Sequence, residues 1–196
     1  MQLPRVLVFA GSNRTGSYNA KLAGAITKTL GSMKCDVTRI TLRDYEMPVY
    51  DADLEDREGP PEAALKLARL FHEQDAVIIV SPEYNTSIPP LVKNTLDWVS
   101  VVKSDSAGEV TPYKDKIFAI ASASPGAFGG ARSLMHLRGV LVNLGCLIVS
   151  EQMSVPRAAD GFDDDEALAD KRAQGLMEKL CKSVIEKAAL LNRRYD

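Results

Sequence analysis

The chain changes character abruptly within residues 6–19, which read VLVFA and then GSNRTGSYN. The apolar run has the length and composition of a β-strand that is buried on both faces, as in a parallel sheet. The loop that follows is rich in Gly, Ser and Asn, and Ser17 stands where it can cap a helix through Leu22, Ile26 and Leu30. A buried strand, a Gly-rich turn and a capped helix predict the first unit of an open α/β sheet.

The loop in this unit is suited to hold an anion. Free N–H groups at a helix start favour a phosphate, and Arg14 adds a cation. The spacing Gly11-x4-Gly16 imitates a nucleoside-triphosphate loop, but the lysine and the magnesium-binding hydroxyl that should follow are missing, and Gly-x-Gly-x-x-Gly is not present either. We therefore expect one phosphate held by hydroxyls, amides and Arg14. A capped turn that binds nothing remains the alternative.

Two later turns have the same construction. Residues 76–80 are an apolar run followed by a Pro-rich loop, in which Tyr84 offers a flat face and Asn85 both donors and acceptors. Residues 117–121 lead into a Gly-rich loop at 124–130, where backbone can approach a ligand closely. Each loop taken singly also fits an ordinary connection. Because the carboxyl ends of parallel strands share one edge, all three are expected to line one site.

The alternation of apolar and amphipathic segments predicts an α/β fold. Strands are expected near residues 5–10, 36–41, 76–81, 116–122 and 146–151. Helices are expected near residues 17–31, 60–74, 88–102, 129–144 and 166–191. Right-handed crossovers then give a doubly wound, five-stranded parallel sheet of order 2-1-3-4-5 with helices on both faces. The polar stretches 51–61 and 160–166 are expected to be surface loops, and the 196 residues to form a single domain.

Composition argues against several classes of function. The net charge of −2, from 24 basic and 26 acidic residues, provides no electrostatic footprint for nucleic acid or a membrane surface. Cys35, Cys146 and Cys181 are scattered without metal-ligand spacing and are expected to be reduced thiols. We find no signal-peptide pattern and no apolar run of about 18 residues, so a cytoplasmic protein without a metal site is expected.

Taken together, the three loops resemble the signature motifs of the NADPH-dependent FMN reductase family, whose members have a flavodoxin-like fold. The family pattern Gly-Ser-x-Arg-x-x-Ser-x-Asn matches residues 11–19. Pro-Glu-Tyr-Asn, with a later Lys-Asn-x-x-Asp-Trp, matches within residues 82–98. Gly-x-x-Gly-Gly-x-Arg, with a later Leu-Arg, matches within residues 126–138. The resemblance extends from about residue 4 to residue 150, and the remainder is generic.

The resemblance implies a flavodoxin-like FMN-binding domain over residues 1–196. The FMN phosphate would lie in the first loop and the isoalloxazine ring against the second, with the third loop closing the polar edge of the ring. The implied cofactor-binding residues are Ser12, Asn13, Arg14, Ser17, Tyr18, Asn19, Pro82, Glu83, Tyr84, Asn85, Ser122, Ser124 and Gly126. No catalytic side chain is assigned, because the cofactor carries the hydride chemistry.

The resemblance also implies an enzyme that takes a hydride from NADPH or NADH and passes electrons through FMN to small acceptors such as quinones, chromate, azo compounds or free flavin. It further implies a homodimer or homotetramer. Two alternatives stay open: a flavodoxin-like electron carrier without efficient NAD(P)H turnover, and a phosphate-ligand binder without flavin. The 2′-phosphate of NADPH would require an arginine, for which Arg14, Arg132 and Arg138 are candidates by charge.

Overall fold

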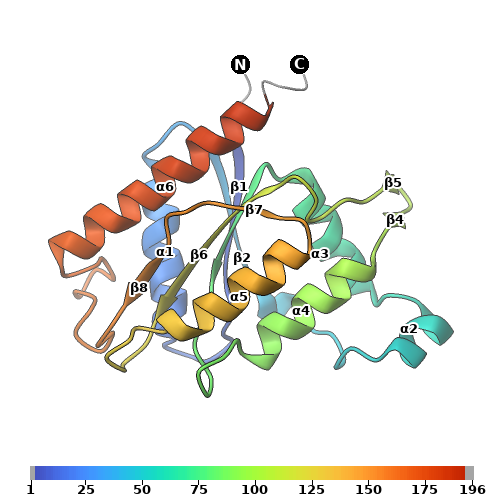
Figure 1. Ribbon diagram of the computed structural model, residues 1–196, viewed down its shortest axis with the longest axis horizontal. Helices are drawn as coiled ribbons and strands as arrows, with labels where there is room; N and C mark the ends of the chain where they lie inside the picture. Colours follow the sequence, from blue (N-terminus) through green and yellow to red (C-terminus); the bar gives the residue numbers. More distant parts are fainter. Residues whose placement is uncertain (1–2, 193–196) are drawn as a thin grey trace.

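A parallel sheet of strand order β2-β1-β3-β6-β7 lies between two layers of helices (Figure 1). The structure is a computed structural model that describes residues 3–192. The strands of the sheet are β1 (Arg5–Ala10), β2 (Asp36–Thr41), β3 (Ala76–Val80), β6 (Ile117–Ala123), β7 (Leu147–Ile148) and β8 (Met153–Val155). The predicted order 2-1-3-4-5 is confirmed, because β6 and β7 occupy its fourth and fifth positions.

Helices cover both faces of the sheet, as predicted. They are α1 (Tyr18–Gly31), α2 (Ala52–Glu58), α3 (Glu62–Glu73), α4 (Pro90–Val101), α5 (Ala131–Asn143) and α6 (Lys171–Asn192), with a short 3₁₀ turn η1 (Leu42–Asp44). Side chains alternate along each strand, so Val6 and Val8 of β1 face α1 and α6, whereas Leu7 and Phe9 face the layer formed by α3, α4 and α5.

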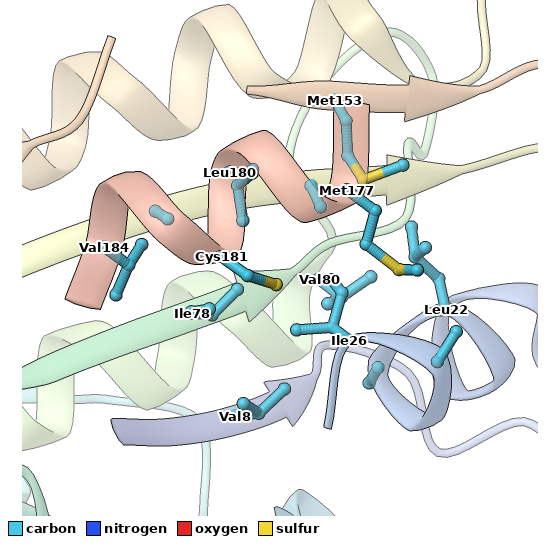
Figure 2. Close-up of a cluster of buried hydrophobic side chains, with 14 of the residues drawn as sticks. Val8, Leu22, Ile26, Ile78, Val80, Met153, Met177, Leu180, Cys181 and Val184 are labelled. Atoms are coloured by element: carbon cyan, nitrogen blue, oxygen red, sulfur yellow. The ribbon is translucent and has the colours of Figure 1, made fainter. Parts of the chain in front are cut away.

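The layer under α1 and α6 is a continuous apolar core (Figure 2). Leu22 and Ile26 of α1 and Leu180 of α6 are fully buried against Ile78 and Val80 of β3. Each such side chain contributes about 1.5–3 kcal/mol by leaving water. This packing fixes α1 on the sheet, and with it the position of the loop that precedes the helix.

The opposite layer is anchored by Trp98 of α4, which is fully buried. The Trp98 indole N–H donates to the Pro48 carbonyl at 2.8 Å, and the Asn94 amide donates to the same carbonyl at 2.8 Å. The Tyr50 N–H in turn donates to Asn94 Oδ1 at 2.7 Å. Asn94 and Trp98 of the second motif therefore hold the segment after β2 against α4, on the flank of the sheet.

The fifth strand, expected at residues 146–151, is divided into β7 and β8. Strand β7 pairs with the start of β6, and β8 pairs with its end. Between them Glu151 leaves the sheet and accepts a hydrogen bond from the Ser183 hydroxyl of α6 at 2.6 Å. The ladder along β6 is therefore interrupted between β7 and β8, where Glu151 contacts α6.

Three local predictions differ from the structure. The stretch 51–61, expected to be a loop, contains α2, which Asp51 caps by accepting from the Asp53 N–H at 2.9 Å. The last helix, expected from residue 166, begins at Lys171, because Asp170 caps it by accepting from the Ala173 N–H at 2.9 Å, while Asp163 Oδ1 accepts from the N–H groups of Asp165 and Ala167 and holds residues 163–167 in a turn. A short hairpin of β4 (Ser104–Asp105) and β5 (Gly108–Glu109) was not predicted.

Within residues 3–192, none of the helices combines the length and the apolar character that crossing a membrane requires. The same described residues contain no group of three or more His, Cys, Asp or Glu side chains arranged to hold a metal ion.

Candidate functional site

The loops after β1, β3 and β6 lie at one edge of the sheet and enclose a pocket of about 290 Å³. Strand register brings them together, since Ala10 pairs with Val80 and Val80 pairs with Ala121, from which β6 continues to Ala123. The Gly11 N–H also donates to the Val80 carbonyl at 2.9 Å, which carries the pairing into the first loop. The pocket is lined by Ser12, Arg14, Ser17, Tyr18, Asn19, Pro82, Glu83, Tyr84, Ala123, Ser124 and Pro125.

The first loop ends in a capped helix start. Ser17 accepts from the Ala20 N–H at 3.4 Å and is almost fully buried, and Gly16 before it has a φ of 67°, which favours glycine. The other first-turn N–H groups of α1 have no carbonyl of their own helix to bind and remain available for an anion. Arg14 lies at the rim, with its Nη2 donating to the Gly16 carbonyl at 3.1 Å and its Cζ 5.5 Å from the centroid of the Tyr18 ring.

Asn19 joins the first loop to the third. Its Nδ2 donates to the Ala123 carbonyl at 2.9 Å, and its Oδ1 accepts from the Ala123 N–H at 2.9 Å. The side chain is only 4% exposed, so both hydrogen bonds lie in the protein interior. Asn19 therefore fixes the spacing between the two loops, with its polar atoms already satisfied by protein.

The second loop presents Tyr84 at the tip of a tight turn. Tyr84 and Ser87 exchange two backbone hydrogen bonds of 3.0 Å, and the two residues between them, Asn85 and Thr86, both have positive φ. Two consecutive positive φ values are typical of the type I′ turn, in which Asn is favoured. The sequence places Asn85 here for the turn, and this turn leaves the Tyr84 ring 50% exposed.

Glu83 binds the start of α5 across the pocket. Its carboxylate forms an ion pair with Arg132 and also accepts from the N–H groups of Arg132 and Ser133 at 3.1 and 3.2 Å. Burial acts to raise the pKa of Glu83, but the hydrogen bonds from Arg132 and the Ser133 N–H outweigh it, and the pKa lies below its usual value. Glu83 is thus an ionised cap that connects the second loop to α5.

The third loop requires glycine where it turns into α5. Gly129 and Gly130 have φ values of 58° and 87°, and a Cβ on Gly130 would lie 1.8 Å from Ser122 Oγ. Ser122 is fully buried beneath this glycine, and its Oγ has no hydrogen-bond partner within the described chain. Ser124 Oγ accepts from the Gly126 N–H at 3.2 Å. The backbone from Ala123 to Pro125 consequently forms the wall of the pocket.

The structure brings most of the predicted binding residues into one lining. Asn13, Asn85 and Gly126 lie in the same loops but outside that lining, and Ser122 lies outside it in β6. Ala123 and Pro125 line the pocket and were not predicted. Their only signal in the sequence is their position at the end of a buried strand, because their contribution comes from backbone and ring surface rather than from a polar side chain.

The residues present fit a phosphate ester attached to a flat ring. The first loop contributes helix N–H groups and Arg14, and no carboxylate within residues 3–192 forms an ion pair with Arg14. The second and third loops contribute flat and apolar surface from Tyr84, Pro82 and the wall from Ala123 to Pro125. Together these groups suit a ligand that carries both an anionic group and an aromatic ring.

Residues 4–160 match the model of a family described as NADPH-dependent FMN reductase. A quinone reductase of Escherichia coli (strain K12) is 34% identical over 147 residues, which cover 75% of this chain and 74% of that protein. The structure of FerB, described as a flavoenzyme NAD(P)H:(acceptor) oxidoreductase from Paracoccus denitrificans, aligns with a TM-score of 0.78 at 25% identity and covers 96% of this chain and 98% of that one. A flavodoxin of Streptococcus pneumonia TIGR4 aligns with a TM-score of 0.56 at 14% identity, covering 93% and 98%, and the predicted flavodoxin-like fold is confirmed.

Proposed function

Because the chain belongs to the NADPH-dependent FMN reductase family, we propose that it is an FMN-dependent NAD(P)H oxidoreductase that reduces quinones or other small electron acceptors. The observation that carries this function is the pocket formed by all three family motifs, whose lining combines cationic and helix-terminal groups with flat and apolar surface. Chromate, azo compounds and free flavin remain further candidate acceptors.

The chain's own residues bind and orient the cofactor. Arg14, Ser12 and the N–H groups after Ser17 hold the phosphate, whereas Tyr84 and the wall from Ala123 to Pro125 hold the ring. Bound FMN would supply hydride acceptance from NAD(P)H and electron delivery to the acceptor. Glu83 is committed to Arg132 and the start of α5, so it positions the second loop and is not a proton donor.

We propose in addition a domain organisation, a location and an oligomeric state. Residues 1–196 form a single FMN-binding domain that acts in the cytoplasm. The protein assembles as a homodimer or homotetramer through the outer side of α5, where Met135 and Val142 are 70% and 60% exposed. These residues are seven apart and share one helix face, and Phe128, 64% exposed, lies just before the helix. Apolar surface of this kind marks an association site.

Steady-state reduction of a quinone by NADPH and by NADH, with FMN present, tests the function. If the protein is the enzyme, the rate of nicotinamide oxidation rises in proportion to the protein concentration. A flavodoxin-like carrier binds FMN but oxidises the nicotinamide slowly. Arg14→Ala should weaken FMN binding about tenfold by removing a charge-assisted contact. Arg138→Ala is the matched control, because Arg138 donates to the Val149 carbonyl and to Gln152 outside the pocket. Equal FMN affinity in the two variants contradicts the placement of the phosphate.

A further inference from the structure

A second cavity adjoins the phosphate end of the pocket on the β2 side of the sheet. This β2-side cavity has a volume of about 330 Å³ and is lined by Ala10, Ser12, Ala20, Arg39, Ile40 and Thr41. Ser12 lines both cavities, which lie on different sides of the first loop. A ligand held by the first loop therefore has open space beside its phosphate, over the ends of β1 and β2.

One arginine lines this cavity, and a second lies close by at the first loop. Arg39 lines it, with its Nη2 donating to the Ala20 carbonyl at 3.1 Å, and Arg43 of η1 donates to the Asn13 carbonyl in the first loop. Each guanidinium has further donors beyond the one used in these contacts. Within residues 3–192, neither arginine forms an ion pair with a carboxylate, whereas Arg69 and Arg132 do.

The position of Arg39 is supported by the helix that it crosses. A Cβ on Gly24 of α1 would lie 3.0 Å from Arg39 Nη1, so the absence of a side chain at Gly24 leaves room for the guanidinium. The cation is thereby placed over the N-terminal half of α1, on the side toward the first loop. A charged group held in this way faces solvent at the edge of the sheet rather than a protein carboxylate.

We propose that the β2-side cavity is a second nucleotide-phosphate subsite, in which Arg39 and Arg43 bind a phosphate of an adenosine moiety. Arg39 lies in β2 and Arg43 in the η1 turn that follows it, and both side chains reach the first loop and the start of α1, beside the proposed site of the FMN phosphate. Guanidinium groups bind phosphate oxygens with two parallel hydrogen bonds. The inference rests on the proposed function, because the phosphate that this subsite adjoins is that of FMN.

Two ligands carry a phosphate of this kind: NADPH has its 2′-phosphate, and FAD has the phosphate of its adenylate half.

The structure also changes which arginines are candidates for binding this phosphate. Arg132 is paired with Glu83, and Arg138 is bound to Gln152. Of the arginines considered from the sequence, only Arg14 lies at the phosphate, and the two further cations beside it come from β2 and η1.

The first arm of the test measures the affinity of FMN-loaded protein for adenosine 2′,5′-bisphosphate and for 5′-AMP by calorimetry. The preference for the bisphosphate should be about tenfold, typical of one charge-assisted phosphate contact. In Arg39→Ala and in Arg43→Ala, the ratio of the affinity for the bisphosphate to the affinity for 5′-AMP should approach one. Arg57→Ala is the matched control, because Arg57 is an exposed arginine of α2 paired with its neighbour Glu58.

The second arm compares FAD with FMN for binding to flavin-free protein. If the adenylate phosphate of FAD is the occupant, the ratio of FAD affinity to FMN affinity falls about tenfold in Arg39→Ala. If the Arg39 and Arg43 variants retain FMN, and both the bisphosphate-to-AMP ratio and the FAD-to-FMN ratio are unchanged in them, the subsite is overturned. The proposed function is then left intact. A wild-type protein that neither binds FMN nor oxidises NAD(P)H with FMN present overturns the proposed function, and this inference with it.

Discussion

The Asn19 side chain and the Ala123 backbone form a reciprocal pair of hydrogen bonds, each 2.9 Å long, across 104 residues of sequence. The pair joins the loop that carries the phosphate-binding groups to the loop that forms the ring wall. It thus makes the shape of the pocket a property of the folded chain, present before any ligand binds.

Asn19→Ala should lower the free energy of unfolding by about 1–3 kcal/mol, because a buried N–H and a buried carbonyl of Ala123 lose their partners. Urea denaturation of flavin-free protein measures this loss. Asn143→Ala is the matched control, since Asn143 is exposed at the end of α5. Equal midpoints for wild type and Asn19→Ala would show that the two loops are not held together by this side chain.

Glu83→Gln should destabilise the protein by about 1.5–3 kcal/mol, because a carboxylate that accepts from Arg132 and from two backbone N–H groups becomes a neutral amide. The FMN affinity should fall as well, since the second loop loses its connection to α5. Glu62→Gln removes an exposed pair with Lys66 and should change stability by less than about 1 kcal/mol. A similar small effect for both variants would contradict the role of Glu83.

Gly11→Ala should destabilise the fold by about 1–3 kcal/mol, since the added Cβ would lie 2.1 Å from Val92 Cγ2 of α4. The backbone at Gly11 has no positive φ, so the penalty comes from this contact. Combining Gly11→Ala with Val92→Ala should therefore cost less than the sum of the two single changes. Thermal unfolding of the four proteins provides the cycle, and strict additivity would place the cause elsewhere.

Glu151→Gln should change how the free energy of unfolding depends on pH in the acid range. Hydrogen bonds, chiefly from the Ser183 hydroxyl, lower the pKa of Glu151 from 4.5 to about 2. A carboxyl group whose pKa is lower in the folded state contributes stability above pH 4.5 and loses that contribution as the pH falls toward 2. The difference in unfolding free energy between wild type and Glu151→Gln should therefore shrink over this interval. A constant difference would contradict the lowered pKa.

The sequence predicted the fold well where local patterns and strand burial agree. The apolar runs at 6–10 and 76–80 are central strands, and the Gly-rich and Pro-rich turns that follow them do meet at one edge. The prediction was weaker at the sheet edge, where the expected strand 146–151 is divided and Glu151 instead contacts Ser183, 32 residues away in sequence. Such a tertiary contact has no signature in local periodicity.

The candidate site shows the same limit. The motifs predicted which loops converge, but they do not distinguish a residue that lines the pocket from one that builds it. Asn85 supplies a left-handed turn conformation, and Asn19 and Glu83 satisfy backbone groups of other loops. Arg39 and Arg43 were not considered, because their relevance depends on how β2 lies beside the first loop.

Electron transfer from a nicotinamide to bound FMN is visible in the absorption of protein that has been reconstituted with FMN, desalted, and mixed anaerobically with NADPH and, separately, with NADH. The flavin should be retained, and its absorption should bleach with at least one of the two nucleotides, the faster one identifying the donor. Retained flavin that neither nucleotide bleaches would contradict the enzymatic function and favour a carrier, and loss of the flavin on desalting would contradict a bound cofactor.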